Sequence, residues 1–188
     1  NGKDLAGWKS TEFGGEGDVL VEEGSIVMTM GNDMTGVTTT RKDLPTIDYE
    51  ISFQGRRVQG NDFFCGLTFP VEKEPCSLIL GGWGGGVCGL SSIDGFDASE
   101  NSTSTFRDFE NGKWYTVRLR VTKPLIVVWI DDEKLLEQDL EGRRISIRAE
   151  VELSRPLGFS TWRTTGAVRD VKMRKLTAKE VAETKPES

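Results

Sequence analysis

Apolar and polar residues alternate with a period of two along most of this chain, and no stretch before residue 177 shows the period of an amphipathic helix. The alternation is clear over residues 47–54, 63–69, 115–122 and 145–154. Each stretch is predicted to be a strand with one buried face, with Cys65 inward in the second. Turn-forming pairs such as Asn111-Gly112 lie between the stretches. Many short strands joined by tight turns predict an all-β fold, a two-sheet antiparallel β-sandwich.

The length of 188 residues predicts one domain with one core. We place that domain at residues 1–176, and within it residues 125–140 read as a β-hairpin. Residues 177–188 are polar and mixed in charge, which predicts a C-terminal tail, either a frayed helix or a disordered segment. The chain starts with Asn1 rather than methionine, so we expect that a segment once preceded it.

The net charge of −6 and the absence of histidine limit the chemistry of the domain. A basic footprint for a nucleic acid is not expected, and no apolar run approaches the ~18 residues of a membrane span. Without histidine, neither a metal site of nitrogen and sulfur ligands nor a histidine-dependent serine or cysteine hydrolase is expected. Cys65, Cys76 and Cys88 are predicted to be structural thiols, with a disulfide among them left open.

The most unusual stretch is LILGGWGGGVCGLSSIDG, residues 78–95. It lacks the lysine and hydroxyl residue that end a phosphate-binding loop, whereas the glycines at 84–86 suit a tight turn between two strands. If Cys76, Leu78 and Leu80 face the core, then Ser77, Ile79 and Trp83 face the opposite side of the sheet.

Three segments resemble one family: NGKDLAGW at residues 1–8, FFCGLTF at 63–69, and GFSTWRTTGAVRDVKMRKL at 158–176. ENGKWYTVRLRVT and WIDDEKLL support the resemblance. Together they are similar to the 3-keto-disaccharide hydrolase family, over nearly the whole of residues 1–176. The resemblance implies a concanavalin A-like jelly roll with a sugar site on its concave sheet. It also implies a bacterial protein exported to the periplasm or the cell exterior.

On that sheet, Trp83 and Trp162 are predicted to form a platform for a sugar, because an indole face stacks on the apolar face of a pyranose ring. Thr68, Ser77 and Ser160 are the small polar residues predicted to bind the ligand with them. The alternative is that both indoles only cover the sheet. The ligand would be a glycoside, an oligosaccharide or a polysaccharide.

The sequence departs from the family at positions that carry polar or ionisable side chains in other members. A glutamate and a glutamine of the family match Ser77 and Ile79, and a histidine matches Val128. A Gln-Asp-His-like stretch matches residues 160–162. The fold is therefore transferred more safely than the activity.

A long polar loop at residues 93–112 is expected to cover one sheet and to supply binding residues. Asn101 is a candidate to bond sugar hydroxyls, and Arg107 to anchor a carboxylate of the loop. No cofactor is expected, although calcium on the oxygen atoms of Asp94, Asp97, Glu100 and Asn101 stays open without EF-hand spacing.

No catalytic residue is assigned from the sequence, and four acids are only candidates for a general acid: Glu50, Asp62, Asp94 and Glu100. Glu150 and Glu152 would share one face of the predicted strand 145–154 and could form the carboxylate pair of a glycosidase. A cross-strand ladder with Arg148, Arg118 and Arg120 explains this pair without catalysis, and we favour the ladder.

Three functions therefore remain open. The domain is a glycosidic-bond-cleaving enzyme, a carbohydrate-binding module without turnover, or a structural or adhesive module of a larger exported protein. The replaced family positions favour binding over turnover.

Overall fold

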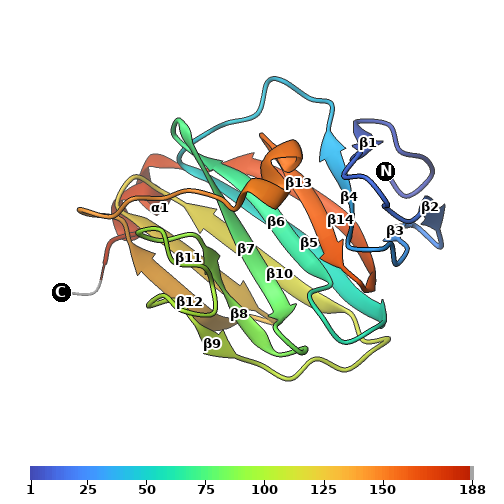
Figure 1. Cartoon of the computed structure of the whole chain (residues 1–188). Coiled ribbons are helices and arrows are strands. Elements are labelled where there is room, and N and C mark those ends of the chain that lie inside the picture. Colours follow the sequence, from blue (N-terminus) through green and yellow to red (C-terminus); the bar gives the residue numbers. More distant parts are fainter. Residues whose placement is uncertain (187–188) are drawn as a thin grey trace.

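A computed structural model describes residues 1–186 as two antiparallel sheets packed face to face (Figure 1). In spatial order, the strands of sheet A are β1 (Trp8–Ser10), β4 (Met34–Thr39), β13 (Gly158–Trp162), β6 (Cys65–Val71), β7 (Glu74–Gly82), β8 (Val87–Ser91) and β9 (Thr105–Phe106). Those of sheet B are β12 (Glu133–Asp139), β11 (Leu125–Ile130), β10 (Tyr115–Val121), β5 (Tyr49–Gln59), β14 (Thr165–Lys175), β3 (Ser25–Met28) and β2 (Val19–Glu22). The predicted all-β, two-sheet antiparallel sandwich is confirmed.

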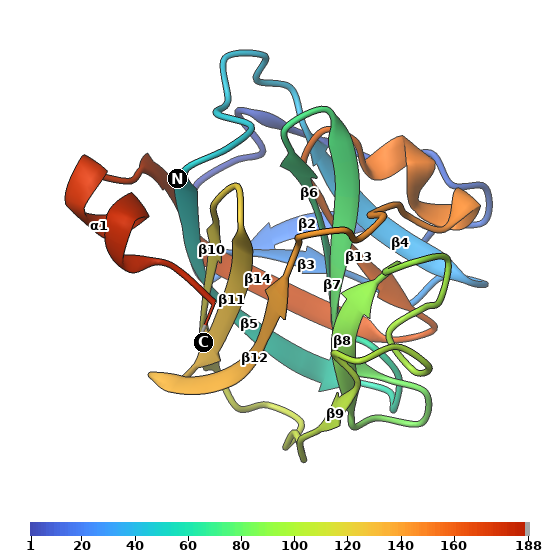
Figure 2. The same ribbon diagram turned by 90° about the vertical axis from the view of Figure 1, so that its left-hand side faces the viewer.

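Two short helices accompany the sheets. A 3-10 helix, η1, spans Ala149–Ser154 and contacts β4 and β13 of sheet A. The helix α1 spans Ala178–Glu183, and Figure 2 shows it on the outer side of sheet B, away from sheet A. No helix in the described part of the chain is long and apolar enough to cross a membrane.

The core lies between the sheets and is built from the inward residues of the alternating strands. Phe159 of β13 packs edge-on against Phe53 of β5, with ring centroids 4.9 Å apart. Leu78 and Leu80 of β7 are fully buried, as parity predicts. The hairpin predicted over residues 125–140 is formed by β11 and β12.

The three cysteines are free thiols buried in this core. Burial raises the pKa of Cys76 to about 12 and that of Cys88 to about 11, and it raises the pKa of Cys65 further still. Such thiols stay protonated at neutral pH and pack as small apolar side chains, as predicted.

The predicted strand at residues 145–154 is wrong. Ile145 forms an isolated bridge to Ile93, and the chain then turns into η1. Because this segment crosses the outer face of sheet A rather than joining its edge, few ladder partners are available to it, and the 3-10 turn satisfies its backbone locally. Its buried residues, Val151 and Ser154, are three apart, which is the period of a 3-10 helix.

The correction also removes the predicted charge ladder of Glu150 and Glu152. Glu150 pairs with Arg148 at 2.9 Å and Glu152 pairs with Arg155 at 2.8 Å, so both contacts are local. Arg118 and Arg120 lie on sheet B, where they pair with Glu50.

Phe63 was predicted to point inward with Cys65, and this is wrong as well. Strand β6 begins at Cys65, and the bend before it breaks the alternation. Phe64 therefore enters the core, whereas Phe63 faces the outer side of sheet A.

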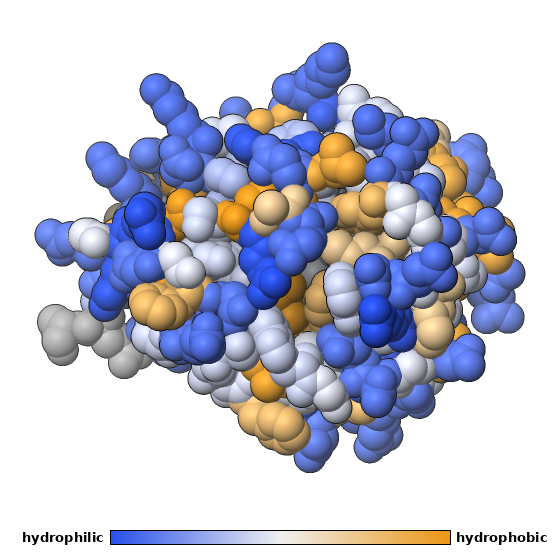
Figure 3. Space-filling view, in the orientation of Figure 1, coloured by the Kyte–Doolittle hydropathy of each residue, from blue (hydrophilic) through white to orange (hydrophobic). Residues whose placement is uncertain are grey.

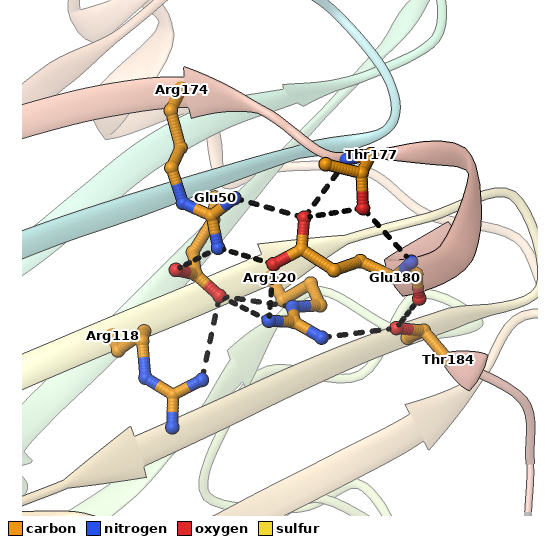
Figure 4. A network of polar contacts seen from close by, with 7 residues as sticks. All are labelled: Glu50, Arg118, Arg120, Arg174, Thr177, Glu180 and Thr184. Carbon is orange, nitrogen blue, oxygen red and sulfur yellow. Dashed lines mark hydrogen bonds and ion pairs between the residues drawn. The ribbon is translucent and has the colours of Figure 1, made fainter. Parts of the chain in front are cut away.

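The C-terminal segment is fixed to sheet B by an ion-pair network (Figure 4). Glu180 of α1 accepts two hydrogen bonds from Arg174 of β14, at 2.8 and 3.0 Å. Thr177 caps the helix, and its hydroxyl accepts a hydrogen bond from the backbone N–H of Glu180. Of the polar tail predicted at 177–188, the first part is thus a short capped helix. Residues 187–188 lie outside the described residues.

Candidate functional site

A pocket of about 280 Å³ opens on the outer face of sheet A. Its walls come from strands β4, β7, β8 and β13, from the loops at Asp62 and Trp83, and from η1. The lining residues are Met34, Asp62, Phe63, Ser77, Ile79, Trp83, Ser91, Arg148, Glu150, Val151 and Trp162. The space-filling view in Figure 3 shows a face rich in hydrophilic residues with a hollow between them.

Small side chains on the outer face of sheet A form the floor of the pocket. The registers of the strands align two rows across sheet A, one of Gly36, Ser160, Gly66, Ile79 and Gly89, and one of Thr38, Gly158, Thr68, Ser77 and Ser91. Apart from Ile79, these rows carry only glycine, serine and threonine, and their small side chains leave room for a ligand above the backbone.

Two tryptophans stand at the rim of this floor. Trp83 lies on the glycine-rich turn between β7 and β8, with a φ of 47° and 44% of its surface exposed. Trp162 ends β13 opposite Met34, and its indole is half-buried. Both indoles line the same pocket, which places two aromatic walls around one space.

A buried arginine holds the turn that carries Trp83. The guanidinium of Arg57, on β5, donates hydrogen bonds to the carbonyl oxygens of Gly81 at 3.0 Å and Gly85 at 2.7 Å. It also donates to the carbonyl oxygens of Asp62 and Phe109. Gly81 has a φ of 77°, and a Cβ there would lie 2.5 Å from the guanidinium. Only glycine satisfies both the backbone and the space at position 81.

The charged part of the rim is dominated by carboxylates. Arg148 donates to Glu150 at 2.9 Å and to Asp97 at 2.9 Å, so its charge is already matched. The hydrogen bond from Arg148 holds the pKa of Glu150 below its ordinary value. Asp62 adds a second carboxylate, whose Oδ1 accepts from the backbone N–H of Phe63 at 2.8 Å. Glu150 is therefore ionised at neutral pH and is unsuited to donate a proton.

Ser91 places a hydroxyl at the pocket that has no partner. Its Oγ is buried and forms no hydrogen bond within residues 1–186. Ser77, next to it in the row, bonds Thr68 through their hydroxyls at 2.8 Å. A buried unpaired hydroxyl costs stability unless a ligand or water bonds it, so Ser91 is a ready contact for a polar ligand group.

The structure brings some predicted ligand-binding residues to the pocket and leaves others away from it. Trp83, Trp162 and Ser77 line it, while Thr68 and Ser160 lie in the floor rows. The amide of Asn101 is used within its own loop, where it donates to the carbonyl oxygens of Leu90 and Phe96. Arg107 reaches Asp131 and Glu133 at the turn between β11 and β12 of sheet B.

The four candidate acids are scattered. Asp62 lines the pocket. Glu50 lies on the outer face of sheet B, and Glu100 lies in a turn of the 93–112 loop. Asp94 accepts hydrogen bonds from the backbone of Arg144 and the side chain of Arg143, and these contacts hold its pKa below the ordinary value. Among the described residues, no three His, Cys, Asp or Glu side chains form a group that could hold a metal ion.

Several pocket residues were not predicted from the sequence. The outward direction of Ser91 could have been predicted, because Cys88 and Leu90 point inward and side chains alternate along β8. Phe63 and Val151 had been assigned to predicted strands. Arg148 reaches the pocket because the segment that leads into η1 crosses the outer face of sheet A. No local sequence pattern predicts that crossing.

Comparison with known proteins identifies the class of this domain. Residues 1–177 match the 3-keto-alpha-glucoside-1,2-lyase-like domain family, so the chain belongs to that family and the resemblance found in the sequence is confirmed. Curated protein sequences give no match.

Solved structures share its jelly-roll fold. A candidate glycosyl hydrolase from Parabacteroides distasonis aligns with a TM-score of 0.58 at 17% identity, over 94% of this chain and 92% of that chain. The carbohydrate-binding module CBM66 from Bacillus subtilis aligns with a TM-score of 0.55 at 10% identity, over 90% and 96%. The carbohydrate recognition domain of Emp47p aligns with a TM-score of 0.59 at 14% identity, over 91% and 89%.

Proposed function

We propose that this domain binds carbohydrate in the pocket on sheet A and does not cleave it. The observation that carries the proposal is the pairing of Trp83 and Trp162 around one hollow with a hydroxyl-bearing floor. Indole faces stack on the apolar faces of pyranose rings, while Ser77 and Ser91 offer hydroxyls to the polar edges. Membership of a family named for a glucoside-acting domain supports the same ligand class.

The size of the pocket limits the ligand. Pockets for drug-sized molecules have volumes of about 300–1,000 Å³, and this pocket has about 280 Å³. It therefore suits one or two sugar rings, as at the end of a chain or in a small glycoside.

Binding without turnover is supported by the ionised state of Glu150 in the pocket. A general acid for glycoside cleavage keeps its proton near neutral pH, which requires a raised pKa. The pKa of Glu150 is instead lowered by Arg148. Ser77 and Ile79 also stand at two of the positions where other family members carry a glutamate and a glutamine.

The position of Asp62 favours an enzyme. Its carboxylate lines the pocket, so a lyase or hydrolase would use it as the acid or base. If the domain turns over its ligand, Asp62→Asn abolishes product formation while sugar affinity remains.

One experiment separates the two functions. Methyl glucosides, galactosides and mannosides, the matching disaccharides and their 3-keto forms are titrated while tryptophan fluorescence and product release are followed. We expect a saturable fluorescence change without product. Trp162→Ala is expected to lower the affinity at least about tenfold, because it removes a stacking surface. The matched variant Trp114→Ala, on sheet B, leaves the affinity unchanged. Product release contradicts the proposal, and so does equal binding by both variants.

A further inference from the structure

The outer face of sheet B carries basic side chains that the pocket on sheet A does not use. The registers of β10, β5 and β14 align three rows: Thr116, Gln54 and Arg169; Arg118, Ser52 and Lys172; and Arg120, Glu50 and Arg174. Glu50 is the one carboxylate in these rows. We call the following set the basic face: Arg56, Arg118, Arg120, Arg169, Lys172 and Arg174. In a chain of net charge −6, this face gathers positive charge on one side.

Two tryptophans contact guanidinium groups of the basic face. Trp114 contacts Arg56 and Arg169, whose Cζ atoms lie 4.5 and 4.0 Å from the ring centroid. Trp129 contacts Arg118 at 3.9 Å. Such cation–π contacts restrict the arginines and leave their N–H edges available to an incoming anion. Because arginines cover these indoles, the rings are not open platforms for a sugar.

The positive charge is matched unevenly along the face (Figure 4). Toward α1, Glu50 pairs with Arg120 at 2.8 Å and with Arg174 at 3.0 Å, and Glu180 also binds Arg174. Within residues 1–186, Arg56 and Lys172 form no ion pair, and Arg169 approaches Asp170 only at 4.0 Å. The end of the face at Trp114 therefore keeps unmatched positive charge.

The make-up of the face favours a linear polyanion over a folded protein. The centre of a protein–protein interface is apolar and poor in charge, whereas this face is charged at its centre. The aliphatic side chains beside it on the same side of sheet B, Val127 and Ala167, are only 4% and 0% exposed. Glu180 lies 2.8 Å from Arg174 and 3.8 Å from Arg120, so a carboxylate fits between these two arginines.

The spacing and total charge favour a polymer of sparse charge. Side chains on one face of a strand repeat every ~7 Å, which spreads the basic groups along the strands. Nucleic acid carries one charge per ~1.7 Å of duplex, and the net charge of −6 would repel so dense a polyanion. An acidic polysaccharide carries its charges one sugar or more apart.

We propose that the basic face of sheet B binds an acidic polysaccharide that bears carboxylate or sulfate groups. Arg56, Arg169 and Lys172 form the primary contacts, and Arg118 extends the site toward α1. This site lies on the opposite side of the sandwich from the pocket, so it does not depend on the function proposed there.

The test measures binding of the full chain to polygalacturonate, to κ-carrageenan, which carries one sulfate for every two sugars, and to neutral dextran at low ionic strength. We expect the two charged polymers to bind and neutral dextran not to bind through this face. The charged polymer that binds more tightly shows whether carboxylate or sulfate is the preferred group. Added salt weakens both, as expected for partly exposed charges.

The double variant Arg169→Gln/Lys172→Gln is expected to weaken binding about tenfold, as two exposed ion pairs are lost. The matched variant Arg41→Gln/Lys73→Gln removes the same charge from exposed sites elsewhere and is expected to leave binding unchanged. Thermal melting of both variants checks that each is folded. Equal weakening by the two variants overturns the proposal, and so does tighter binding of poly-glutamate or duplex DNA than of either polysaccharide.

A second pair of variants tests whether α1 competes for the face. Glu180→Gln removes the carboxylate that occupies Arg174, whereas Glu183→Gln removes the same charge from an exposed position paired with Lys179. We expect Glu180→Gln to raise the affinity for the polymer and Glu183→Gln to leave it nearly unchanged. A loss of affinity in Glu180→Gln contradicts the site.

Discussion

The two outer faces of the sandwich are built from the same alternating pattern but differ in the size and charge of their outward residues. On sheet A the outward rows hold mostly glycine, serine and threonine, and the result is a hollow between Trp83 and Trp162. On sheet B the outward rows are rich in arginine and lysine, and the result is a charged face.

This comparison shows that the outward residues of a sheet decide whether loops and helices beside it can enclose a pocket or whether the face stays covered by long side chains. The tryptophans illustrate the difference. Trp83 and Trp162 border an open pocket, and Arg163 lies 5.5 Å from the ring centroid of Trp162. Guanidinium groups lie closer to Trp114 and Trp129, at 4.0 and 3.9 Å. The same residue type therefore offers a stacking surface on one face and supports cations on the other.

The largest expected effect separates two adjacent residues of β5 that serve opposite faces. Arg57→Met leaves the carbonyl oxygens of Gly81 and Gly85 without a donor in a buried place, and should lower the free energy of unfolding by about 3 kcal/mol. Arg56→Met removes only a contact with Trp114 and should cost less than about 1 kcal/mol. Urea denaturation measures both, and equal losses would refute the role given to Arg57.

Glu50→Gln tests the centre of the charged face. The side chain of Glu50 is 8% exposed and lies among Arg118, Arg120 and Arg174. Burial raises its pKa, but hydrogen bonds from Arg120 and Arg174 outweigh that effect and the pKa lies below the ordinary value. Neutralising it should destabilise the fold by about 2 kcal/mol, because three arginines lose a shared partner. Sugar affinity should stay constant, and a parallel loss would show that the faces are coupled.

Ser91→Ala tests the pocket floor with little effect on the fold. Because its hydroxyl has no partner, the free energy of unfolding should be unchanged or slightly higher. Sugar affinity should fall about fivefold if the hydroxyl bonds the ligand, as one neutral hydrogen bond is lost. Ser154→Ala is the control, since Ser154 also carries a buried unpartnered hydroxyl but does not line the pocket. Titration calorimetry of both variants decides the point.

The smallest expected effect is the pH dependence of the contact between α1 and sheet B. The hydrogen bonds from Arg174 and Thr177 lower the pKa of Glu180 to about 2 from an ordinary value of 4.5. A lowered pKa means that the contact stabilises the docked helix above pH 4.5 and is lost as the pH falls toward 2. The protection of the Thr184 amide, its exchange rate relative to that of an unstructured peptide at the same pH, should therefore fall over that range, and Glu180→Gln should remove the dependence. Unchanged protection down to pH 2 would contradict the docking.

Much of the fold could be predicted because the alternation is local. Residues 115–121 and the hairpin at 125–139 follow the pattern almost to the residue. The same parity argument placed Ser77 and Trp83 on one side of β7, which is the side that opens into the pocket.

What could not be predicted depends on contacts between distant residues. Val151 alternates with its neighbours in sequence, but it sits on a 3-10 helix because the segment crosses a sheet rather than joining it. Arg57 looks like any charged residue of a strand until the carbonyls it bonds are brought together. The rows of the basic face exist only through the registers of three strands, so Glu50 read as a lone acid although it is the centre of a cluster.

The five tryptophans allow a direct test of where sugar binds. Each indole N–H gives its own NMR signal, which single Trp→Phe variants assign, and these signals are followed while a neutral glycoside is added. We predict that the signals of Trp83 and Trp162 shift together with one saturation curve, while those of Trp114 and Trp129 stay in place. Shifts confined to the other tryptophans, or a different curve for each of the two, would contradict a shared sugar site on sheet A.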